Sequence, residues 1–97
     1  MGKIRVLNQR EIMSVLDMQS VIAAVKKAFY YKSHNQAEVY PLICKMYENG
    51  GEFDIKSGEC SGTEVFGLKL VCGFPENVSL GLPRSNGMIV VYDLNHG

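Results

Sequence analysis

The sequence predicts an α+β fold in which N-terminal helices pack on a mostly antiparallel sheet. Apolar residues recur at helical spacing in the first third of the chain, and strand-like segments separated by turn residues fill most of the rest. Helices followed by a run of strands are typical of the α+β class. The 97 residues suffice for one small domain, residues 1–97, whose own core would be marginal.

The first residues predict a short strand that runs into a capped helix. Polar and apolar residues alternate through 3–7, as in a strand with one buried face. Asn8 is followed three residues later by Glu11, which is close to the spacing of a capping box. The apolar residues that come next predict a short helix over 12–16.

A second, longer helix is predicted to begin at Asp17, a residue type that caps helices well. Apolar residues then recur three and four positions apart and mark a face that packs in the core: Met18, Val21, Ile22, Val25, Ala28 and Phe29. Lysines in the later turns suit the negative end of the helix dipole. The helix should end near residues 33–35.

The middle of the chain predicts a β-hairpin. Residues 39–47 are β-branched, aromatic and apolar, with Pro41 near the start of the strand, where a missing donor is tolerated. The segment Glu-Asn-Gly-Gly at 48–51 is a strong turn signal. A second strand over 52–57 should therefore run antiparallel to the first.

The last third predicts two more strands. A Gly/Ser loop over 58–63 leads to a strand over 65–72, and a long polar loop over 73–87 follows. Residues 88–92 are apolar on both faces, so this strand is expected to lie inside the sheet. The turn at 93–97 then calls for a further element, and we expect the chain to be part of a longer protein.

Composition excludes several classes of function. Ten basic and ten acidic residues give a net charge of zero, which argues against nucleic acid or a membrane surface as partner. Nothing approaches the roughly 20 apolar residues of a membrane span, and the N-terminus is too polar for a signal peptide. The odd cysteine count and the two unclustered histidines (His34 and His96) favour a cytoplasmic protein with reduced thiols and no metal.

Four basic side chains are candidates for a binding site, although the chain holds no dinucleotide fingerprint or phosphate-binding loop. Lys69 interrupts an otherwise apolar strand, so it either extends to an edge or points into a polar pocket. Lys56 alternates with apolar neighbours, and a solvated hairpin face explains it equally well. Lys45 shares a strand face with Ile43 by the two-residue period, and Arg84 could bind an anion or simply be solvated.

Three ordered segments together resemble the ornithine cyclodeaminase/mu-crystallin family. The first runs from Val6-Leu7-Asn8-Gln9 through Val15-Leu16-Asp17-Met18 and along the predicted helix as far as Ala28-Phe29. The second is Gly67-Leu68-Lys69-Leu70-Val71 with Gly73-Phe74-Pro75-Glu76-Asn77. The third is Gly81-Leu82-Pro83 followed by Asn86-Gly87-Met88-Ile89-Val90-Val91-Tyr92-Asp93.

The resemblance implies the front part of a substrate-binding and dimerisation domain. Members of the family pair this domain with a Rossmann domain that binds NAD or NADP, and they associate as homodimers through their sheets. They deaminate and cyclise ornithine or interconvert other small amino acids and imines. Lys69 matches the family's strand lysine, which implies a catalytic role facing the substrate carboxylate and the nicotinamide.

Three departures from the family pattern put ornithine itself in doubt. Ile43 stands where many relatives carry a basic substrate-binding residue, and Lys45, two positions on, is the candidate to replace it. Lys56 supplies a charge where many relatives have methionine. Arg84 stands where a threonine near the cofactor is common, so Arg84 is expected to bind substrate and Ser85 to approach the cofactor.

The family's Rossmann glycines and catalytic aspartate have no counterpart in residues 1–97, so no bound cofactor and no turnover are expected of this chain alone. Three readings follow. The chain is a fragment of a family enzyme, a free-standing dimerisation or ligand-binding module, or one half of a split enzyme.

Overall fold

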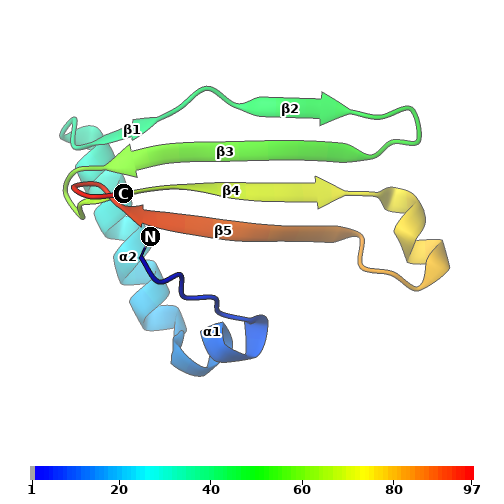
Figure 1. The fold of residues 1–97 in the computed structure, drawn as a ribbon, viewed down its shortest axis with the longest axis horizontal. Coiled ribbons are helices and arrows are strands. Elements are labelled where there is room, and N and C mark those ends of the chain that lie inside the picture. The colour runs from blue at the N-terminus through cyan, green and yellow to red at the C-terminus, as the bar shows by residue number, and fades with distance from the viewer. Residues whose placement is uncertain (1) are drawn as a thin grey trace.

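The computed structural model describes residues 2–97 and consists of a single five-stranded antiparallel sheet with two α-helices (Figure 1). The strand order is β1-β3-β4-β5, and β2 pairs with the same edge of β3 as β1 does. The α+β prediction is thereby confirmed. The elements are α1 (Gln9–Val15), α2 (Met18–Ser33), β1 (Ala37–Val39), β2 (Ile43–Met46), β3 (Glu52–Cys60), β4 (Val65–Gly73), the 3-10 helix η1 (Pro75–Leu80) and β5 (Ser85–Asp93).

The capping box at the start of α1 is confirmed. The Glu11 N–H donates to the Asn8 side chain at 2.9 Å, and the Asn8 N–H donates to the Glu11 carboxylate at 2.8 Å. The strand predicted over 3–7 is wrong, because residues 2–8 have no regular secondary structure. Alternation alone does not make a strand, since a strand also needs a neighbour for its backbone groups.

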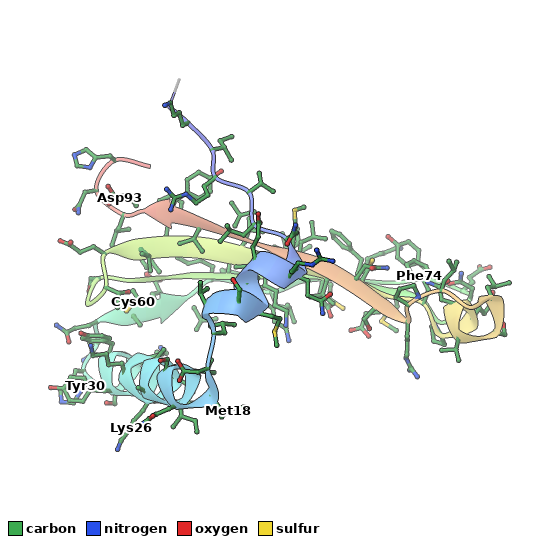
Figure 2. The ribbon with its side chains drawn as sticks, turned by 90° about the horizontal axis from the view of Figure 1, so that it is seen from below. Met18, Lys26, Tyr30, Cys60, Phe74 and Asp93 are labelled. Carbon is green, nitrogen blue, oxygen red and sulfur yellow. The ribbon has the colours of Figure 1, made fainter. Side chains whose placement is uncertain are left out.

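Helix α2 begins and ends where the sequence indicates. Asp17 is the N-cap, and its carboxylate accepts from the Ser20 N–H and hydroxyl, each at 2.8 Å. The helix ends at Ser33, with His34 as C-cap. Its contacts with the sheet are made with β1 and β3, and it lies on one side of the sheet (Figure 2).

The strand predicted over 39–47 is split into β1 and β2 around Pro41. The Tyr40 N–H still donates to the Ser57 carbonyl at 3.0 Å, but Pro41 has no N–H with which to continue the ladder. The hairpin turn is confirmed, because the Tyr47 N–H donates to the Gly51 carbonyl at 2.8 Å. Gly50 in this turn has a φ of 80°, a conformation that favours glycine.

The loop predicted over 58–63 is partly wrong, because β3 continues to Cys60. A Cβ at Gly58 would lie 2.5 Å from the Glu38 carbonyl oxygen, so this glycine permits the close approach of β1 to β3. The glycine marks a packing constraint rather than a turn. The next strand, β4, confirms the strand predicted over 65–72.

The long loop predicted over 73–87 is shorter than expected, since it contains η1 and β5 already begins at Ser85. The prediction that the last strand lies inside the sheet is wrong for residues 2–97, where β5 pairs with β4 alone. Apolar residues on both faces favour burial of both faces of a strand, but they do not require a neighbouring strand at each of its edges. The closing turn is confirmed by a 2.8 Å bond from the Gly97 N–H to the Asp93 carbonyl.

The described residues are unusually open for their size. Their accessible surface is 8410 Å², whereas a compact chain of this mass exposes about 5,500 Å². The radius of gyration is 16.0 Å, against about 12.5 Å for a compact domain. No apolar side chain in residues 2–97 is buried. The sheet is therefore a layer whose apolar surface lies largely uncovered.

Candidate functional site

The strand register gives the sheet two chemically different faces, because directly paired residues point to the same side. One row across four strands is entirely apolar: Ile43, Ile55, Leu70 and Met88. We call the side that carries this row the apolar face. The opposite side carries Lys56 and Lys69, and we call it the lysine face.

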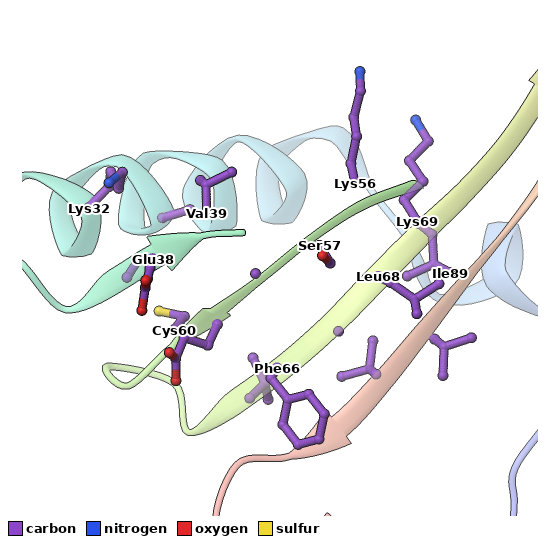
Figure 3. Close-up of a pocket in the computed structure, with 18 of the residues that line it drawn as sticks. Lys32, Glu38, Val39, Lys56, Ser57, Cys60, Phe66, Leu68, Lys69 and Ile89 are labelled. Carbon is purple, nitrogen blue, oxygen red and sulfur yellow. The ribbon is translucent and has the colours of Figure 1, made fainter. Parts of the chain in front are cut away.

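Lys56 and Lys69 are direct cross-strand partners on β3 and β4, with Ile89 of β5 next in the same row. The two side chains extend in the same direction from adjacent strands (Figure 3). Neither ammonium lies within 4 Å of a carboxylate in the part of the chain that the structure describes, where the one ion pair joins His96 to Asp93 at 2.9 Å. The lysine face thus presents two adjacent cations without a counter-ion.

An open groove of about 680 Å³ lies between α2 and the sheet, and both lysines line it (Figure 3). Helix α2 contributes Val25, Ala28, Phe29 and Lys32 to its wall, and β1, β3, β4 and β5 contribute the remainder, which includes Glu38 and Glu59. The lining is largely apolar, and the side chains of Lys56 and Lys69 are themselves exposed and accessible to a ligand. The groove therefore suits a small ligand with at least one anionic group.

The structure does not bring the other predicted residues to this pair. Lys45 is paired with Phe53 and lies on the apolar face, where it shares the side of Ile43 as predicted and is on the opposite side of the sheet from Lys69. Ser85 lies on the lysine face, but it is four positions along β5 from Ile89, which corresponds to about 13 Å. Arg84 precedes β5, and its carbonyl accepts from the Phe74 N–H at 2.8 Å.

Cys44, Glu52 and Asp54 lie nearer the β2 end of the lysine face, with one potential metal-ligand atom each within 4.8 Å of the others. Hydrogen bonding to Asp54 raises the pKa of the Cys44 thiol, and burial and the Asp54 charge add to the shift. Hydrogen bonding to Asp54 and its charge likewise raise the pKa of Glu52, although Lys56 opposes this. The three groups thus engage one another, and exposed groups of this kind commonly cluster without a metal.

The family model for the ornithine cyclodeaminase/mu-crystallin family matches residues 3–97. The chain belongs to this family. No helix in residues 2–97 is long and apolar enough to cross a membrane.

Two curated proteins resemble the whole chain. It is 27% identical over 99 residues to the "Putative dehydrogenase RB0419" of Rhizobium meliloti (strain 1021). It is 26% identical over 100 residues to the "Uncharacterized cyclodeaminase y4tK" of Sinorhizobium fredii (strain NBRC 101917 / NGR234). Both matches cover 100% of this chain, which spans 30% of each relative's length.

Two solved structures share the fold. An archaeal alanine dehydrogenase dimer with bound NAD matches with a TM-score of 0.84 and 25% identity, over 92% of this chain and 27% of its own. The iminosuccinate reductase of Paracoccus denitrificans in complex with NAD+ matches with a TM-score of 0.82 and 19% identity, over 92% and 28% respectively. The family's strand-and-helix layer is therefore present here as a partial domain.

Sequence reasoning identified Lys56 and Lys69 separately but missed that they are partners. Strands β3 and β4 form a hairpin in which paired residues lie at equal distances from the turn, which is centred between residues 62 and 63. The sequence predicted a loop over 58–63, whereas the turn lies over 61–64. The pairing of Lys56 with Lys69 could not be predicted from the misplaced loop. The groove beside α2 has no sequence signal, since it depends on where the helix lies against the sheet.

Proposed function

We propose that this chain supplies the substrate-facing surface of a nicotinamide-dinucleotide-dependent enzyme that acts on a small amino acid or its imine. Lys69 is the residue that meets the substrate. The observation that carries the proposal is its position in a largely apolar groove with no carboxylate partner among residues 2–97. Membership of the ornithine cyclodeaminase/mu-crystallin family supports the substrate class, and the bound NAD of the two similar structures supports the cofactor.

The chemistry of Lys69 fits an amino-acid substrate. Every α-amino acid carries a carboxylate, and an ammonium on a flexible stem can bind it and can donate or accept a proton at the reacting centre. A fixed strand backbone holds the Lys69 Cα in register, which limits the positions that its ammonium can take. Lys69 would therefore orient the substrate and take part in proton transfer.

The dinucleotide, when bound, supplies the hydride chemistry. Residues 2–97 contain no Gly-rich turn between a strand and a helix, which is the unit that cradles the pyrophosphate of a dinucleotide. This chain's proposed share of the site is consequently the substrate side. Ser85, on the same face as Lys69 but farther along the sheet, is the residue we propose to approach the cofactor.

We also propose that a second copy of the chain covers the apolar face. The row formed by Ile55, Leu70 and Met88 is a continuous apolar strip across three strands. The archaeal alanine dehydrogenase that shares this fold is described as a dimer, which supports an assembly of two copies.

Kinetics of lysine variants test the proposal. The protein, purified in its native assembly, is assayed with NAD or NADP against small amino acids by the absorbance of the reduced nicotinamide. Lys69→Ala should lower kcat/KM by about 100-fold or more, in the range that proton-transfer groups contribute. Lys26→Ala is the matched control, because Lys26 lies on α2 and points away from the sheet (Figure 2).

Equal rates for the Lys69 and Lys26 variants would refute the assignment of Lys69. Turnover with none of the amino acids, from a protein that is dimeric and cooperatively folded, would instead favour a free-standing binding module. Activity that appears only when a second polypeptide co-purifies would identify a split enzyme.

A further inference from the structure

We propose that Lys56 makes this a site for a doubly anionic substrate, a small amino or imino dicarboxylate, in which Lys69 binds one carboxylate and Lys56 the other. The inference rests on the proposed function and specifies its substrate class. What points to it is the juxtaposition of two unneutralised ammonium groups on neighbouring strands of one groove.

The pairing of the two lysines calls for an anion. Like charges directly opposite each other in an antiparallel sheet are destabilising, so such a pair is retained at a cost unless a ligand neutralises it. No carboxylate of the described chain does so within 4 Å of either ammonium. A dianion placed between the two side chains removes the repulsion and forms two charge-assisted contacts.

The neighbouring acids on this face are already engaged. Asp54, two positions before Lys56 on β3, groups with Cys44 and Glu52 rather than pairing with a lysine. The charge of Lys56 reaches this cluster, since it partly opposes the rise in the pKa of Glu52. The cluster does not neutralise the lysine pair, whose ammonium groups are left for a ligand.

Two glycines adjoin the lysines on the same face. The next row pairs Gly58 with Gly67, and both line the groove. A Cβ would lie 2.5 Å from the Glu38 carbonyl oxygen at Gly58 and 2.4 Å from the Val90 carbonyl oxygen at Gly67, so the neighbouring strands approach both positions closely. Neither glycine places a side chain between the lysines and the rest of the groove.

The pair can reach both ends of a short dicarboxylate. Directly opposed residues have Cβ atoms about 4.5–5.5 Å apart, so two flexible lysine side chains that start from adjacent strands can each bind one carboxylate of a four- or five-carbon diacid. A monocarboxylic amino acid would satisfy one lysine and leave the other unneutralised. The site should therefore prefer an acidic amino acid over its neutral isostere.

Aspartate and asparagine provide the test, because they share size and shape and differ by one negative charge. Binding is measured by isothermal titration calorimetry and kcat/KM by turnover, on the protein in its native assembly. Lys56→Met should weaken aspartate binding and lower its kcat/KM by about 10- to 100-fold, as expected for loss of a charged hydrogen bond. Asparagine should change by less than about twofold, and Lys26→Met should leave both ligands unaffected.

The outcomes separate this inference from the proposed function. If wild-type protein prefers asparagine, or if Lys56→Met changes both ligands alike, the dicarboxylate site is wrong even when Lys69→Ala abolishes turnover. If Lys69→Ala has no effect on any substrate, the proposed function itself fails. Lys56→Gln, which keeps a polar side chain on the exposed strand, replaces Lys56→Met if that variant does not fold, and the same outcomes apply.

Discussion

Gly51→Ala is expected to destabilise the far end of the sheet, where the β2–β3 turn meets η1. Gly51 is the one buried residue in the described chain. A Cβ at this position would lie 2.3 and 2.5 Å from two atoms of the Phe74 ring. These distances are far below van der Waals contact, so the ring must move. It is stacked on Tyr47 with centroids 5.9 Å apart, and moving it disrupts that pair.

The expected cost follows from these contacts. Adding a methyl group to a filled site costs about 1–3 kcal/mol, and an aromatic pair contributes about 0.5–1.5 kcal/mol beyond its burial. For a chain of about 100 residues, each kcal/mol shifts Tm by about 4–8 °C. The two terms together come to about 1.5–4.5 kcal/mol, so Gly51→Ala should lower the Tm, measured by circular dichroism, by roughly 6–36 °C.

Gly73→Ala is the matched control at the same end of the sheet. Its Cβ would meet the Ser85 Oγ at 3.6 Å and the Arg84 carbonyl oxygen at 3.8 Å, which are ordinary contacts. Its Tm should be unchanged or slightly raised, because alanine restricts the unfolded chain. Combining Gly51→Ala with Phe74→Leu should recover part of the loss. An unchanged Tm for Gly51→Ala, or an equal loss in both glycine variants, would refute the reasoning.

Two further predictions concern the apolar face and the start of α2. Leu70→Lys should weaken the proposed dimer by about 100-fold or more, because it buries an unpaired charge in the interface. Light scattering measures the dimer, and Val78→Lys in η1 is the control. A dimer that Leu70→Lys leaves unchanged would contradict the proposed interface. Hydrogen bonds from the Ser20 N–H and hydroxyl lower the pKa of Asp17 in the folded chain. The Asp17 carboxylate therefore stabilises the folded state fully above its unfolded pKa. This stabilisation is lost as the pH falls through the lower folded pKa. Helical circular dichroism should therefore decrease below about pH 4, whereas Asp17→Asn, which still caps α2, should flatten this transition; an identical pH profile for the two proteins would contradict the role of the carboxylate.

Local chemistry explains which parts of the fold could be predicted. The caps at Asn8 and Asp17, and the turn around Gly50, depend on residues close in sequence, and all three are confirmed. The strand predicted over 3–7 failed because a strand needs an adjacent strand for its backbone hydrogen bonds, and an alternating sequence pattern does not provide one. The loop predicted over 58–63 failed because Gly58 is required by its close approach to the Glu38 carbonyl oxygen and not by a turn. That atom lies far away in the sequence, so no local rule describes the contact.

The candidate site shows the same division. The sequence alone determined the residue types: a lysine within an apolar strand at Lys69, a second charge at Lys56, and the ordered segments that mark the ornithine cyclodeaminase/mu-crystallin family. Only the tertiary structure decided which of them act together. Pairing of β3 with β4 sets Lys56 beside Lys69, and the two-residue period of a strand places Lys45 on the opposite face. Side-chain identity is a local property, whereas register and face are fixed by the backbone hydrogen bonds between strands.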